Sequence, residues 1–182
     1  MKARKVRGLD PATPLGYNAE RIVRARLDEL CSFMPQAADP AAITALHDMR
    51  IAAKRLRYIL EITHPCFGPY AGAAVNSIKD CQDVLGEIHD CDVQLPEVRA
   101  FLDELVVADA TALLDGAAEP PNREAFAGLV ALSAELLARR ERRFRAFAEL
   151  WRQLERSGFR ARLEYAVCER SGANGRATIE PP

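Results

Sequence analysis

Residues 47–61 of this chain read HDMRIAAKRLRYILE, and their apolar side chains recur with the spacing of an amphipathic α-helix. At about 100° per residue, those apolar side chains form one face that can pack on a core. The opposite face carries a polar stripe only about 80° wide. The stripe consists of His47, Arg50, Lys54 and Arg57. This run therefore predicts a core-facing helix that presents three cations and a histidine in one row.

A row of one charge sign is unusual on a helix surface. Exposed stripes normally alternate acids and bases, because opposite charges at i,i+4 stabilise each other. Here only Glu61 closes the row at its C-terminal end. Like charges held this close repel one another unless an anion, or acids from other helices, neutralise them. Two interpretations follow: a solvated face paired by neighbouring helices, or an anion-binding site.

The composition is that of a soluble, single-domain protein without an overall excess of positive charge. The chain has 182 residues, 49% hydrophobic and 28% charged, and its 25 basic and 26 acidic residues give a net charge of −1. Any affinity for an anion must therefore come from local clustering of charge. The five cysteines are scattered without a C-x-x-C pair, which indicates reduced thiols and a cytoplasmic location. No apolar run approaches the roughly 20 residues of a membrane span.

Turn and capping signals divide the chain into amphipathic segments. Thr13 and Asp39 each precede a proline and read as helix N-caps, and Asn122 reads as a third. Pro96 reads either as a helix breaker or as the start of a further helix. Gly158 is expected to interrupt the last helical stretch. The predicted helices cover residues 14–34, 40–64, 71–93, 96 to 107 or 114, 123–156 and 159–170.

No alternating strand pattern stands out between these segments. We therefore predict an all-α fold, an antiparallel helical bundle of five or six amphipathic helices with short loops. Residues 13–170 are expected to form this bundle, after a flexible basic lead-in at 1–12 and before a disordered tail at 171–182.

Two other predicted helices carry basic side chains next to their apolar faces. Lys79 and His89 share a stripe in the segment 71–93, and Arg139 and Arg143 stand at i,i+4 in the segment 123–156. Guanidinium forks match phosphate oxygens in a bidentate way. If these helices turn their basic rows toward residues 47–57, the rows line one basic groove.

Two motifs resemble the CHAD family, the conserved histidine α-helical domain. Residues 47–58 are similar to the signature helix of that family, and residues 85–93, LGEIHDCDV, to its second motif. Lys54 stands where arginine is commoner, and His89 where arginine or asparagine is more usual. The resemblance covers most of residues 14–165. It implies an all-α fold whose basic surface binds inorganic polyphosphate, often near or fused to a triphosphate-tunnel (CYTH) domain.

The resemblance and the stripes together define the predicted site. Carboxylates repel phosphate, so we expect Asp90 and Asp92 of the second motif to hold Arg55 or Arg57 in place. The predicted polyphosphate ligands are His47, Arg50, Lys54, Arg57, Lys79, His89, Arg139 and Arg143. The predicted supporting or weaker residues are Arg24, Arg55, Asp90, Asp92 and Arg140.

Other functions fit the sequence less well. A divalent-metal site at His47 and His89 with nearby acids is an alternative, but a ring of arginines and lysines disfavours a cation there. We expect no catalysis and no cofactor, because no nucleophile elbow, P-loop, HExxH or glycine-rich phosphate loop is present. Nucleic acid is disfavoured because Tyr58 is the only aromatic residue near the row. Apart from polyphosphate, the expected partners are a CYTH-type triphosphatase, for which the chain would be an accessory module, or polyphosphate granules, with the chain a monomer or homodimer.

Overall fold

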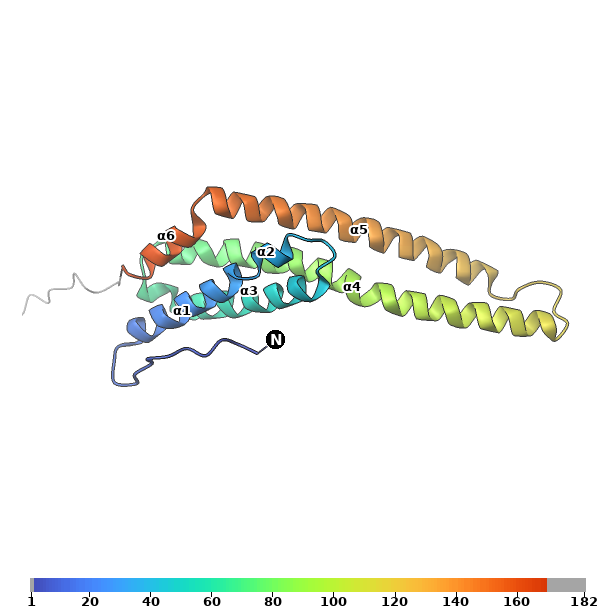
Figure 1. Cartoon of the computed structure of the whole chain (residues 1–182), viewed down its shortest axis with the longest axis horizontal. Helices are drawn as coiled ribbons and strands as arrows, with labels where there is room; N and C mark the ends of the chain where they lie inside the picture. The colour runs from blue at the N-terminus through green and yellow to red at the C-terminus, as the bar shows by residue number, and fades with distance from the viewer. Residues whose placement is uncertain (1, 170–182) are drawn as a thin grey trace, which may run out of the picture. The chain divides into compact units, whose positions relative to one another are not determined.

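The apolar periodicity of the sequence produces a series of helices between Leu15 and Ala166 (Figure 1). The computed structural model describes residues 2–169 of the chain. The prediction of an all-α helical bundle is confirmed. The elements are α1 (Leu15–Cys31), α2 (Met34–Ala37), α3 (Ile43–Thr63), the 3-10 helix η1 (His64–Cys66), α4 (Tyr70–Leu114), α5 (Arg123–Arg156) and α6 (Phe159–Ala166).

The chain divides into two compact units. Unit 1 contains the residues as far as Asp83 together with those from Ala148 onward, and unit 2 runs from Val84 to Phe147. The long helices α4 and α5 therefore each contribute one part to unit 1 and one part to unit 2.

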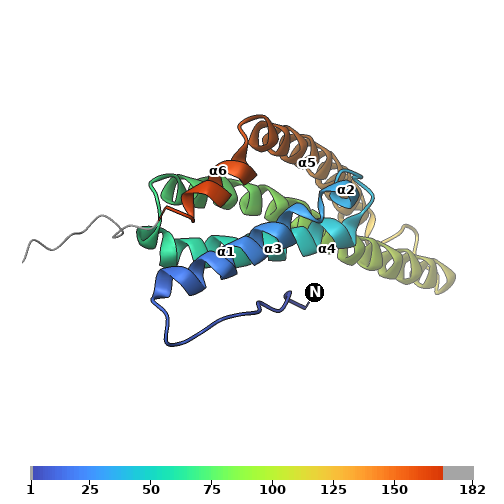
Figure 2. The same cartoon turned by 60° about the vertical axis from the view of Figure 1, so that its left-hand side comes forward.

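Unit 1 has a core formed by the predicted apolar stripes. Helix α1 lies beside α3 in both views, and the short turn through η1 returns the chain into α4 (Figures 1 and 2). Burial of these side chains supplies the main favourable free energy of folding. The buried side chains include Val23, Leu27 and Leu30 of α1, Met49, Leu56 and Leu60 of α3, Ile78 and Cys81 of α4, and Trp151, Phe159 and Leu163 near the C-terminus.

Unit 2 is a hairpin of two antiparallel helical segments, which Figure 1 shows at the right. Its buried apolar side chains are Leu85, Ile88, Cys91 and Leu95 of α4 and Leu136 and Phe147 of α5, and Val98 packs against the cluster of Cys91, Leu95 and Leu136. At the closed end, the backbone N–H and the side-chain amide of Asn122 both donate to Asp109 Oδ1, at 3.0 and 2.8 Å. Asn122 is the residue before α5, as predicted, but its side chain ties the loop to α4.

The division of residues 71–114 into two helices was wrong, because α4 continues through Pro96. The proline ring removes one N–H, which would otherwise donate to the carbonyl of Asp92 four residues earlier. Leu95 and Val98, on either side of Pro96, pack on the same cluster around Leu136. With this shared packing, α4 remains one helix despite the missing hydrogen bond.

Four predicted helix boundaries were also wrong. The last helix, predicted over residues 159–170, ends at Ala166. Helix α1 starts at Leu15, and Thr13 Oγ1 donates to the Asp10 carbonyl instead of capping the helix. Helix α3 starts at Ile43, because the Asp39 carboxylate accepts from the N–H of Ala41 in a turn.

The first predicted helix ends three residues early, at Cys31, and the expected break after residue 34 contains α2 instead. Pro35 lies in the first turn of α2, where a proline costs no hydrogen bond.

The predicted lead-in has no regular secondary structure, but hydrogen bonds attach it to α1. The Arg4 guanidinium donates to Ser32 Oγ at 2.7 Å, and the side-chain amide of Asn18 donates to the Asp10 carbonyl at 2.7 Å. The tail predicted at 171–182 lies outside the described residues. Within those residues, no helix is both long enough and apolar enough to cross a membrane.

Candidate functional site

Helix α3 places the predicted row of basic side chains along one side. His47, Arg50, Lys54 and Arg57 follow one another at spacings of three, four and three residues. The opposite side is fixed in the core, because its apolar side chains are 0–2% exposed. These are Leu46, Met49, Ala52, Ala53, Leu56 and Leu60. The helix therefore cannot rotate the row inward without losing its buried apolar contacts.

Two cations of the row lie against the aromatic ring of Tyr58. Lys54 Nζ lies 5.6 Å, and Arg57 Cζ 4.9 Å, from the centre of its ring. The ring is 44% exposed, so the pair is held at the surface. Attraction between a cation and an aromatic face is worth about 0.5–1 kcal/mol at exposed sites. The ring thus offsets part of the repulsion between Lys54 and Arg57.

Two cations of the row, Arg50 and Lys54, form no ion pair with an acid of the described residues. Arg57 Nη1 lies 3.7 Å from Glu61 Oε1 on its own helix. Between residues 2 and 169, no ion pair involves Arg50 or Lys54, nor Lys79 on the part of α4 in unit 1. Within the described residues, acids therefore do not neutralise Arg50, Lys54 or Lys79 by ion pairs.

Three polar atoms on α3 and α4 are buried without a hydrogen-bond partner. They are Arg50 Nε, Arg57 Nε and Gln82 Oε1, all within unit 1. A buried donor or acceptor without a partner costs about 1–3 kcal/mol. In native proteins, ordered water or an ion commonly satisfies such an atom. Two of the three belong to arginines of the row.

Arg55 differs from its neighbours because it is paired with a buried acid. Its Nη1 lies 3.0 Å from Glu29 Oε1, and Arg26 Nη1 lies 2.6 Å from Glu29 Oε2. Glu29 is only 1% exposed. We expected Asp90 or Asp92 to hold Arg55 or Arg57; the structure gives this role at Arg55 to Glu29 of α1. The sequence contains one indication of this pairing, which is that Glu29 stands beside the apolar stripe of α1.

Comparison with known proteins agrees with the motifs on α3 and α4. The family model of the CHAD domain matches residues 3–99, just over half of the chain. The chain belongs to the CHAD family. Both motifs quoted above, at residues 47–58 and 85–93, lie inside the matched range. No curated protein and no solved structure matches the chain.

Outside the CHAD match, the arginines of α5 in unit 2 are paired with acids of α4. Arg139 and Arg143 both contact Glu87 Oε2, at 3.4 and 2.7 Å. Arg140 Nε lies 2.5 Å from Asp92 Oδ1. The acid of the second CHAD motif thus holds an arginine, as expected for its role, but that arginine is Arg140.

The other predicted site residues are His89 and Asp90 of unit 2 and Arg24 of unit 1. His89 is half-buried and Asp90 is exposed, both in unit 2. Arg24 is fixed within unit 1, where its Nε lies 3.1 Å from Glu20 Oε1 and its Nη2 donates to the Glu164 carbonyl at 3.2 Å. These contacts give Arg24 a structural role between α1 and α6.

The described part of this CHAD chain offers no metal site. No group of three His, Cys, Asp or Glu side chains among residues 2–169 could hold a metal ion. The alternative based on His47 and His89 therefore receives no support.

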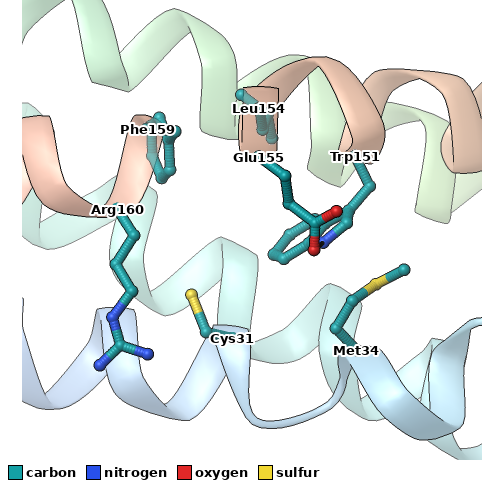
Figure 3. A pocket seen from close by; sticks show the side chains of 7 residues that line it. All are labelled: Cys31, Met34, Trp151, Leu154, Glu155, Phe159 and Arg160. Atoms are coloured by element: carbon teal, nitrogen blue, oxygen red, sulfur yellow. Dashed lines mark hydrogen bonds between the residues drawn. The ribbon is translucent and has the colours of Figure 1, made fainter. Parts of the chain in front are cut away.

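A hollow of about 260 Å³ in unit 1 is separate from the basic row (Figure 3). Apolar side chains dominate its lining, and Trp151 Nε1 donates to Glu155 Oε1 at 2.8 Å at its edge. Burial raises the pKa of the Cys31 thiol, so the thiol stays neutral near pH 7. The residues around the hollow are Cys31, Met34, Trp151, Leu154, Glu155, Phe159 and Arg160. A neutral, mostly apolar hollow does not suit a polyanion.

Proposed function

We propose that the protein binds inorganic polyphosphate along α3 and that it acts by binding alone, without catalysis. The proposal rests on the missing hydrogen-bond and ion-pair partners of Arg50. Its Nε is buried without a hydrogen-bond partner, and no acid forms an ion pair with it in the described residues. A phosphate oxygen would supply both a hydrogen-bond acceptor and a negative charge.

The dimensions of the row suit a linear polyanion. From His47 to Arg57 the helix rises about 15 Å. Successive side chains of the row are about 5–6 Å apart at their Cβ atoms. A phosphate chain presents a negative charge on every unit, so it can contact several of these side chains at once. A single phosphate ion could reach only one or two of them.

Lys79 is the further cation we assign to this site. It is exposed on the part of α4 that belongs to unit 1 and has no ion pair within residues 2–169. Gln82, one turn further along α4, supplies a buried carbonyl oxygen without a partner. An ordered water between that oxygen and the ligand would satisfy it.

The contacts of the Tyr58 ring favour polyphosphate over nucleic acid as the ligand. Proteins that bind single strands stack bases on exposed aromatic faces. Tyr58 already has Lys54 and Arg57 against its ring. The row therefore offers charge to a polymer but no free stacking surface.

Family membership supports the same ligand and suggests the setting. The CHAD resemblance implies polyphosphate binding near a CYTH-type triphosphatase or at polyphosphate granules. We propose these as partners, and an intracellular location, because polyphosphate has to be available to the site.

The test is a titration of the protein with polyphosphate, single-stranded DNA and a series of divalent cations. We expect polyphosphate to bind most tightly, with an affinity that falls steeply between about 50 and 200 mM salt as condensed counterions are released. Equal or tighter binding of DNA, or an affinity that does not change with salt, would contradict the proposal. A phosphate-release assay on the same sample should show no turnover.

A further inference from the structure

The hollow of Figure 3 lies within unit 1 and is separate from the basic row of α3. Cys31, the last residue of α1, and Phe159, the first residue of α6, both line it. Trp151 and Glu155 reach it from the last two turns of α5. One water molecule occupies roughly 30 Å³ of liquid. A volume of about 260 Å³ therefore suits a ligand of about nine non-hydrogen atoms.

Apolar side chains form most of the wall of the hollow. Trp151, Leu154 and Phe159 are 5%, 8% and 3% exposed, so the core fixes their positions. Met34 of α2 completes the wall, and a thioether packs favourably against an aromatic group. Covering this wall with an apolar or aromatic group removes apolar surface from water, which is favourable. The wall therefore suits the apolar part of a small molecule.

Glu155 is the one acid that lines the hollow. Its Oε1 accepts a hydrogen bond from Trp151 Nε1 at 2.8 Å, which holds the carboxylate beside the indole (Figure 3). Among residues 2–169, no basic side chain forms an ion pair with Glu155. An ionised carboxylate can accept about four hydrogen bonds. Its second oxygen, Oε2, can therefore accept a hydrogen bond from a ligand in the hollow.

Arg160, the one basic residue of the lining, is paired with other acids. Its Nη2 lies 2.5 Å from Asp28 Oδ1, and its Nε lies 2.9 Å from Glu164 Oε1. With Glu155, three acids thus surround one base. The Cys31 thiol lies within range of all four charges: burial is the main cause of its raised pKa, Arg160 lowers the pKa, and the three acids raise it. The charges around the hollow therefore favour a cation over an anion.

We infer that this hollow binds a small organic cation, a primary ammonium group attached to an aromatic or alkyl body. The body packs on the wall formed by Trp151, Phe159 and Met34. The ammonium group donates to Glu155 Oε2. Such a charge-assisted hydrogen bond is roughly twice as strong as a neutral one, so the ammonium is preferred to an alcohol of the same shape.

A metal ion suits the hollow less well than an organic cation. Glu155 is the single carboxylate in the lining, whereas Ca²⁺ takes about six to eight oxygen ligands. Within the described residues, no group of three His, Cys, Asp or Glu side chains could hold a metal ion. A metal ion also leaves the apolar wall uncovered.

A titration of the full chain with three small probes tests the inference. Trp151 is the only tryptophan of the chain, so its indole N–H gives a single resonance in spectra of ¹⁵N-labelled protein, and this resonance reports on the hollow. The cationic probe is 2-phenylethylammonium, with 2-phenylethanol as its neutral counterpart and phenylacetate as the anion. The ammonium should bind with a dissociation constant of about 1 mM, and the alcohol at least about tenfold more weakly. Phenylacetate should not saturate the site.

Glu155→Gln tests the role of the carboxylate. Glutamine keeps an oxygen that can accept from Trp151 but removes the charge. The dissociation constant of the ammonium should rise about tenfold, and that of the alcohol should stay within about twofold. The matched control is Glu149→Gln on the same helix, because Glu149 is 44% exposed and pairs with Arg152. It should change neither constant by more than about twofold.

The outcomes separate the parts of the inference. An indole resonance that moves with none of the three probes would overturn the hollow as a binding site. An alcohol or a carboxylate that binds as tightly as the ammonium would overturn the preference for a cation. Equal effects of Glu155→Gln and Glu149→Gln would overturn Glu155 as the partner of the ammonium. The comparison of the three probes needs no variant, so it decides the charge preference even if Glu155→Gln does not fold.

Discussion

Arg55 of α3 donates from Nη1 to Oε1 of Glu29 in α1, at 3.0 Å, and Glu29 is 1% exposed. This contact separates the arginines of α3 into two groups. Arg55 is neutralised by a buried acid and joins two helices of the core. Arg50, by contrast, has a buried Nε without a hydrogen-bond partner. The same helix thus contains one arginine that is paired with a buried acid and another, Arg50, that forms no ion pair in the described residues.

Glu29→Gln should therefore destabilise the protein. Arg26 and Arg55 both contact the Glu29 carboxylate, and their side chains are only 14% and 26% exposed. Breaking a buried ion pair from one side typically costs about 3–5 kcal/mol, because the remaining charge stays buried. Urea unfolding followed by circular dichroism measures the loss.

The control for that prediction is Glu61→Gln. Glu61 is 42% exposed and lies 3.7 Å from Arg57, so its loss should change the free energy of unfolding by less than about 1 kcal/mol. Equal effects of the two substitutions would contradict a special role for Glu29.

Removing Arg50 and Arg57 together should weaken polyphosphate binding without unfolding α3. A charge-assisted hydrogen bond contributes about 1.5 kcal/mol, so the double alanine variant should lose about 100-fold in affinity. The slope of log affinity against log salt should fall by about 2, one for each lost phosphate contact. Isothermal titration at several salt concentrations measures both quantities.

The control for the Arg50 and Arg57 prediction removes two positive charges from α5 instead of α3. Arg152→Ala with Arg156→Ala deletes two exposed arginines of α5, and Arg152 pairs with Glu149 at the surface. If this pair weakens binding as much as the α3 pair, the affinity comes from net charge and the row is not the site.

Local patterns in the sequence predicted the helices well, because helical periodicity is fixed within a few residues. The α3 row, the Gly158 break and the extent of α5 follow from spacing alone. At Gly158 the backbone has φ of 66°, which glycine adopts without strain. Continuity of α4 through Pro96 could not be predicted, since it depends on packing against Leu136, 40 positions away in the sequence.

Charge pairing was the least predictable part of the site. Glu29 and Arg55 are separated by 26 residues, and Glu87 and Arg139 by 52. Helical spacing shows that a basic residue lies near the edge of the core. It does not show which acid of another helix contacts that residue. For this reason the sequence predicted that an acid holds Arg55, but it did not identify Glu29 as that acid.

Alkaline solution should destabilise the protein through Cys81. Burial raises the pKa of this thiol to about 12, and the side chain is 0% exposed. The unfolded thiol loses its proton near the ordinary value of 9.0, whereas the folded one keeps it. The folded state then binds more protons, so stability is fully present below about pH 9 and falls as the pH rises toward 12.

Urea unfolding between about pH 8 and pH 11 tests this effect. Cys81→Ala should flatten the decline, although it lowers stability at neutral pH by leaving a small cavity. Cys168→Ala, at an exposed cysteine, should leave the decline unchanged. A parallel decline in all three proteins would assign the pH dependence to other groups.

Pro96→Ala should stabilise α4. Alanine restores the N–H that can donate to the Asp92 carbonyl and removes the ring from a helix interior, where proline is less favourable than alanine by about 3 kcal/mol. Part of that gain is offset because the unfolded chain becomes more flexible. We therefore expect an increase of about 1–2 kcal/mol, measured by urea unfolding. Pro121→Ala, in the loop before α5, restores no helical hydrogen bond and should lower stability slightly. An unchanged or lower stability of Pro96→Ala would mean that packing around Leu136 requires the proline ring itself.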